Sequence, residues 1–71
     1  MDQFKQLQHL AKAERNVAGG EHRISEQELR IADLDCRGHD TTLARSLLET
    51  FRVTQAQYIA LRDHILRELA Q

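Results

Sequence analysis

The sequence predicts an all-α protein: an antiparallel hairpin of two long helices in one domain spanning residues 1–71. The chain contains no proline and is rich in glutamine, glutamate, arginine, leucine and alanine, which are strong helix formers. Its apolar residues recur at helical spacings of three and four. A chain of this length buries only about 60% of the surface that its unfolded form exposes, so its core is marginal. We therefore expect the hairpin to dimerise into a four-helix bundle.

The first helix is predicted over residues 2–36. Its core row keeps a spacing of seven straight across the pair Gly19-Gly20, and two charged rows flank it in the same phase. The core row is Leu10, Val17, Ile24 and Ile31, the acidic row is Glu14, Glu21, Glu28 and Asp35, and the basic row is Arg23, Arg30 and Arg37. A broken helix would have no reason to hold three rows in phase, which favours one continuous helix.

The alternative is a three-helix bundle with a break at Gly19-Gly20. Ser25 and Glu28 match the capping box of a helix start. Ile24 and Leu29 are spaced as its hydrophobic staple. Within a continuous helix, the two glycines cost about 2 kcal/mol relative to alanine.

The turn is predicted over residues 37–40 and the second helix over residues 41–70. Gly38 is placed as the left-handed residue that ends the first helix, and Asp40 or Thr41 can cap the second. So short a connection forces the two helices antiparallel. The apolar stripe of the second helix comprises Ala44, Leu47, Leu48, Phe51, Tyr58, Leu61, Ile65 and Leu69, with Thr54 inside it.

The hairpin core is predicted from these rows to comprise Leu10, Val17, Ile24, Ile31, Leu47, Phe51, Tyr58, Leu61 and Ile65. Folding the hairpin about His39 places Gly20 opposite Tyr58. A large ring needs a small residue facing it. Gly20 is therefore predicted to make room for Tyr58, while Gly19 points outward.

Four apolar residues have no partner in this hairpin. Phe4 and Leu7 lie opposite positions beyond the end of the second helix, and Ile59 and Leu66 form a second stripe on that helix. On so small a domain, two apolar patches indicate a contact surface. We expect a non-catalytic protein–protein interaction module, an adaptor or regulatory partner, that associates with itself or with another protein.

A nucleic-acid-associated regulator acting as a dimer is the alternative function. It would use Arg23, Arg30, Arg37, Arg45 and Arg52. The net charge of −1 and the neighbouring carboxylates dilute the field that phosphate binding needs, which disfavours this alternative. A parallel coiled coil is a rival arrangement, with Arg23 meeting Glu28 and Arg30 meeting Asp35. Its second core row, Ala13, Gly20, Gln27 and Leu34, is too weak for a good zipper.

No enzyme, metal or cofactor is expected. The four histidines match no zinc or di-iron spacing; they are His9, His22, His39 and His64. Cys36 lies near a helix C-terminus, where the dipole disfavours its thiolate. The longest apolar run, Tyr58–Leu61, is too short for a membrane span. The lone cysteine and an N-terminus unlike a signal peptide favour the cytoplasm.

The stretch GHDTTLARSLLETFRVTQAQYIALRD, residues 38–63, resembles the centre of short uncharacterised bacterial helical-hairpin proteins of about this length. The run HLAKAERNVAGGEHRI, residues 9–24, is similar to a segment found upstream in them. This resemblance implies a bacterial origin and a helical hairpin, and it implies no activity. The chain departs from the family at Gly19-Gly20, where a single glycine with an acidic neighbour is expected. That departure bears on the continuity of the first helix.

Overall fold

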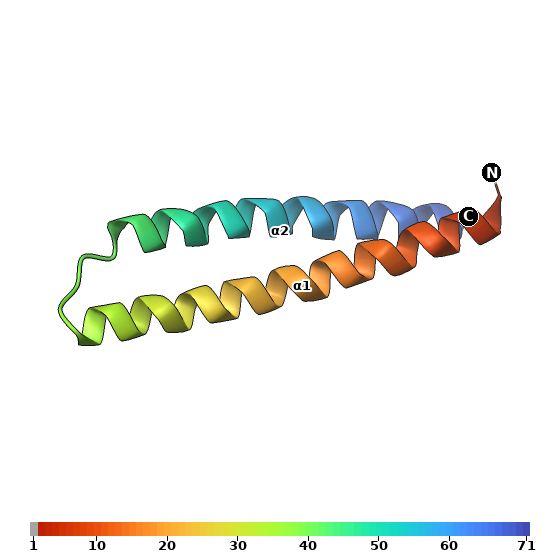
Figure 1. The fold of residues 1–71 in the computed structure, drawn as a ribbon. Coiled ribbons are helices and arrows are strands. Elements are labelled where there is room, and N and C mark those ends of the chain that lie inside the picture. The colour runs from red at the N-terminus through yellow and green to blue at the C-terminus, as the bar shows by residue number, and fades with distance from the viewer. Residues whose placement is uncertain (1) are drawn as a thin grey trace.

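The computed structural model describes residues 2–71 as two helices, α1 (Gln3–Cys36) and α2 (Thr42–Leu69). They run antiparallel along each other, joined by one short turn, and both chain ends lie at the same end of the molecule (Figure 1). The hairpin is elongated, with Cα extents of 54 × 14 × 13 Å. The prediction of an all-α hairpin of two long helices is confirmed.

Helix α1 passes through Gly19-Gly20 without a break, so the three-helix alternative is wrong. The capping box is not used, because Ser25 lies inside the helix. Leu29 is 72% exposed and so forms no hydrophobic staple. Val17 and Ile31, on either side of the glycines, are both buried in the hairpin. Packing against α2 therefore offsets the low helix propensity of the glycine pair.

The end of α1 is set by local hydrogen bonding in the turn. Gly38 has a φ of 72°, the left-handed conformation that glycine adopts without strain. The N–H of His39 donates to the carbonyl of Leu34 at 3.0 Å, and the N–H of Gly38 donates to that of Asp35 at 3.0 Å. This pair of bonds is a Schellman motif, and it confirms the predicted role of Gly38.

An aspartate accepts hydrogen bonds at the start of each helix. Asp2 Oδ1 accepts from the N–H of Phe4 at 3.0 Å. Asp40 Oδ1 accepts from the hydroxyl of Thr42 at 2.7 Å and from its N–H at 2.9 Å. Of the two candidate caps for α2, Asp40 supplies the bond, because Thr41 makes no side-chain capping bond. The hydroxyl bond first, and then the N–H bond, hold the pKa of Asp40 below its usual value of 3.8.

The core between the helices is thin and partly polar. Its buried residues are Ala13, Val17, Ile31, Leu48 and Ile65, together with Gly20 and the three glutamines Gln6, Gln27 and Gln55. The small residues of α1 let the helices approach closely. Gln27 Nε2 donates to the carbonyl of Ala44 at 2.9 Å, so this buried amide is bonded to the facing helix. The row that is too weak for a parallel zipper, Ala13, Gly20, Gln27 and Leu34, therefore packs in the hairpin together with the row of Val17 and Ile31.

Two predicted core residues lie on the surface instead, which corrects the expected packing of α2. Leu47 is 44% exposed and Leu61 is 50% exposed. Leu48 and Gln55 are buried in their place, at 8% and 7% exposure. The pattern was ambiguous because Leu47 and Leu48 are adjacent and equally apolar, while the true row continues through polar residues. The other seven predicted core residues are buried or half-buried.

The residue facing Gly20 is Gln55, so the predicted pairing with Tyr58 is wrong. A Cβ at Gly20 would lie 1.7 Å from Gln55 Oε1, whereas one at Gly19 would meet only the guanidinium of Arg23 at 3.6 Å. Gly20 does make room, as predicted, but for an amide rather than a ring. The helices are aligned almost one turn away from the register expected by folding the chain about His39.

The same shift changes the position of the N-terminal apolar residues. Gln6 Nε2 donates to Glu68 Oε2 at 2.8 Å, which aligns the first turns of α1 with the last turns of α2. Leu7 is therefore level with the end of α2, and Phe4, one turn earlier, is level with the last residues of the chain. The prediction that they lie beyond the end of α2, which ends at Leu69, is therefore wrong for Leu7 and holds for Phe4.

Candidate interaction surface

The hairpin has two long faces, one on either side of the plane that contains both helices. The first, the ion-pair face, consists of Leu7, Glu14, Glu21, Glu28 and Asp35 on α1 and of Arg45, Arg52, Ile59 and Leu66 on α2. Arg45 Nη2 lies 2.8 Å from Asp35 Oδ2, and Arg52 Nη2 lies 3.3 Å from Glu28 Oε2. A spacing of seven keeps residues on one side of a packed helix, so both rows continue along this face.

These cross-helix ion pairs were missed by sequence reasoning, although their signal was present. The acidic row of α1 and the two arginines of α2 share the spacing of seven. Only the alignment of the helices shows which acid meets which base. Both pairs join side chains that are about half exposed, so each contributes little to the stability of the hairpin itself.

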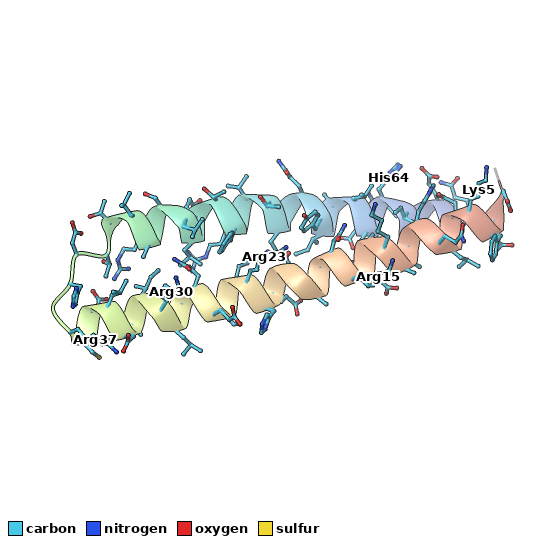
Figure 2. The ribbon with its side chains drawn as sticks, in the orientation of Figure 1. Lys5, Arg15, Arg23, Arg30, Arg37 and His64 are labelled. Carbon is cyan, nitrogen blue, oxygen red and sulfur yellow. The ribbon has the colours of Figure 1, made fainter. Side chains whose placement is uncertain are left out.

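The opposite face, the groove face, is hollowed between the helices. Its rows are His9, Asn16, Arg23, Arg30 and Arg37 on α1 and Leu47, Thr54, Leu61 and Glu68 on α2. One hollow of about 290 Å³ is lined in part by Arg23 and Thr54. A second of about 490 Å³ is lined in part by His9 and Leu61. The basic residues of this face follow one another along α1 (Figure 2).

The four predicted contact residues are all accessible. Phe4 is 65% exposed, Leu7 51%, Ile59 36% and Leu66 43%. Leu7, Ile59 and Leu66 belong to the rows of the ion-pair face, and Phe4 precedes Leu7 by one turn. The structure therefore brings three of the four predicted residues onto one face of the hairpin.

The five arginines proposed for nucleic-acid binding do not form one basic surface. Arg45 and Arg52 are paired with carboxylates on the ion-pair face, and Arg37 Nε lies 3.4 Å from Asp33 Oδ2. Arg23 and Arg30 lie on the other side of the hairpin. Carboxylates within 4 Å and the division between two faces both weaken the field at any one face.

A polar cluster closes the open end of the hairpin. Glu68 accepts from Gln6 and lies 2.5 Å from His64 through its other oxygen, and Gln6 Oε1 lies 3.2 Å from His9 Nδ1. The cluster joins the first turns of α1 to the last turns of α2. Among residues 2–71, no three histidine, cysteine, aspartate or glutamate side chains are grouped so as to hold a metal ion.

The remaining candidate groups lie apart on the surface. Cys36 is free and exposed at the end of α1. His22 Nε2 lies 2.7 Å from Glu26 Oε1, an i,i+4 pair along one helix. Neither helix of the described residues has the length and apolarity needed to cross a membrane.

Comparison with known proteins gives no functional guide: no protein-family model, curated protein or solved structure matches the chain.

Proposed function

We propose that this chain is a small non-catalytic protein–protein interaction module, an adaptor or regulatory partner, that associates with a second copy of itself. The proposal rests on one observation: more large apolar residues are exposed on the hairpin than apolar residues are buried in its core. Among residues 2–71, five apolar residues are buried, whereas nine large apolar residues are at least 36% exposed. The exposed set is Phe4, Leu7, Leu29, Leu43, Leu47, Val53, Ile59, Leu61 and Leu66. Covering such a surface with a partner is favourable because it removes apolar area from water.

The total surface supports the same proposal. The hairpin exposes 5400 Å², whereas a compact monomer of its mass would expose about 4,500 Å². The excess of about 900 Å² is close to the roughly 800 Å² that each partner buries in a standard protein interface. A second hairpin could therefore cover the area that this elongated fold leaves exposed.

The contact is proposed to involve Phe4, Leu7, Ile59 and Leu66. They are large, apolar and accessible, and three of them share the ion-pair face. We also propose a bacterial, cytoplasmic protein, supported by the resemblance described above and by the lone exposed thiol. A nucleic-acid regulator has weaker support, because the arginines it would use are divided between two faces.

The melting temperature as a function of protein concentration tests the proposal. If association stabilises the fold, the melting temperature of the wild-type chain rises with concentration. Ile59→Glu should abolish that rise, whereas Leu29→Glu, an equally drastic change at a 72%-exposed site off both faces, should preserve it. A wild-type melting temperature that does not change with concentration would contradict the proposal.

A further inference from the structure

We infer that the second copy docks on the ion-pair face, related to the first by a two-fold axis parallel to the helices. The inference rests on the self-association proposed above and names its face and symmetry. Such an axis places α1 of one copy against α2 of the other, antiparallel and at the level they have within one hairpin. Every contact then occurs twice, as in any isologous dimer.

The charges of this face are complementary to themselves under that symmetry. Within one hairpin, Glu28 meets Arg52 and Asp35 meets Arg45. Because α1 and the second copy's α2 repeat the same antiparallel relation, each arginine would lie between two carboxylates, one from each chain. Four charges of alternating sign would then surround the axis at each of two levels. The side chains are 51–58% exposed, which leaves them free to reach the second copy.

The apolar half of the face lies toward the chain ends. Ile59 and Leu66 continue the row of the two arginines, and Leu7 continues the row of the acids. A second copy would cover these three side chains, and burial of their apolar area supplies the affinity that surface ion pairs lack. The face thus has its ion pairs near the turn and its three apolar side chains near the termini, where Glu14 and Glu21 lie among them.

Glu14 and Glu21 should oppose dimerisation through this face. Neither belongs to an ion pair among residues 2–71. In the dimer they would lie beside the second copy's Leu66 and Ile59, where a charged group is costly to desolvate. Neutralising Glu14 should therefore tighten association, which is an effect of opposite sign to that of breaking an ion pair.

The groove face does not have this self-complementarity. The same two-fold axis on that side would place Arg23 and Arg30 against the second copy's Thr54 and Leu47, which carry no charge. The carboxylate of this face, Glu68, lies near the chain ends and already contacts His64 and Gln6. The two copies of the basic row would repel each other. The observations therefore favour the ion-pair face.

Charge reversal tests the assignment through the dissociation constant of the dimer, measured by sedimentation equilibrium. Glu28→Arg and Arg52→Glu should each weaken the dimer about tenfold or more, because each reversal acts twice in a symmetric dimer. An equimolar mixture of the two variants should regain dimer, because across the mixed interface every reversed charge faces an opposite one. Arg23→Glu, on the groove face, is the matched control and should leave the dissociation constant unchanged.

The possible negative results contradict different parts of the proposal. A wild-type chain that stays monomeric would overturn the proposed function together with this inference. If Arg23→Glu weakens the wild-type dimer and Arg52→Glu does not, the ion-pair face is not the interface, although the chain still self-associates. The same conclusion follows if the equimolar mixture of Glu28→Arg and Arg52→Glu forms no more dimer than either variant alone. If the reversals lower the helical circular dichroism, Glu14→Gln replaces them. A several-fold tighter dimer would support the inference, and an unchanged or weaker one would contradict it.

Discussion

The carboxamide of Gln55 packs against Gly20 in the middle of the hairpin. Its Nε2 donates to the carbonyl of Val17 at 2.8 Å, and its Oε1 is buried without a hydrogen-bond partner among residues 2–71. A Cβ on Gly20 would lie 1.7 Å from that oxygen. The absence of a side chain at Gly20 is thus what allows a buried amide to bond across to the facing helix. Gly19, on the outer side, has no such role.

The two glycines should respond oppositely to substitution. Gly20→Leu should lower the free energy of unfolding by about 3 kcal/mol, because it overpacks the contact and breaks the buried hydrogen bond. Gly19→Leu should raise it by about 1 kcal/mol, because leucine has the higher helix propensity and meets only a guanidinium. Urea unfolding followed by circular dichroism measures both. Equal effects of the two substitutions would contradict this packing.

A double-mutant cycle decides whether Gln55 or Tyr58 is the side chain that requires a glycine at position 20. In a Gln55→Ala background, Gly20→Ala should become stabilising by about 1 kcal/mol, because the amide is gone and the gain in helix propensity remains. In a Tyr58→Ala background, Gly20→Ala should remain destabilising. The reverse pattern would show that the ring determines the glycine.

The adjacent leucines of α2 offer a matched test of the core. Leu48→Ala should cost about 3 kcal/mol of unfolding free energy, since it leaves a cavity in a thin core. Leu47→Ala, at a site 44% exposed, should cost less than about 1 kcal/mol. Chemical denaturation of both variants at one protein concentration checks the difference. A larger loss of unfolding free energy in Leu47→Ala than in Leu48→Ala would show that Leu47, and not Leu48, lies in the core.

Asp40 should make the start of α2 sensitive to acid. Its pKa is lower in the folded chain than in the unfolded one, because Thr42 donates two hydrogen bonds to the carboxylate. The stabilisation is therefore present above the unfolded pKa and is lost as the pH falls through the folded pKa. Asp40→Asn keeps an effective cap without titrating there.

The check on Asp40 is the melting temperature of both chains between about pH 5 and about pH 2. The wild-type chain should lose more than Asp40→Asn over that interval, with other carboxylates contributing equally to both. Parallel curves of melting temperature against pH would show that protonation of Asp40 does not change the stability of α2.

Features of the fold that depend on local sequence were predictable. Gly38 ends α1 because only a residue tolerant of positive φ suits a Schellman motif, and an aspartate before α2 caps it. The unbroken spacing of seven through Gly19-Gly20 correctly predicted one long helix. Each of these signals lies within a few turns of the element it determines.

The features that could not be predicted from the sequence depend on the alignment of the two helices along their axes. Gln55 rather than Tyr58 faces Gly20 because the alignment differs by almost one turn from the expected one. The polar contacts made in this alignment, such as the bond of Gln6 with Glu68, leave no apolar pattern in the sequence. For the candidate site, the exposure of Ile59 and Leu66 was predictable from their place off the core stripe. The ion pairs beside them required the alignment.

The molar mass in solution, measured by light scattering across a concentration series, tests self-association of the hairpin without any substitution. The mass of the wild-type chain should rise with concentration from 8.2 kDa toward twice that value, whereas Ile59→Glu should keep it at the monomer mass. A folded, fully helical chain that remains at 8.2 kDa at every concentration would contradict self-association.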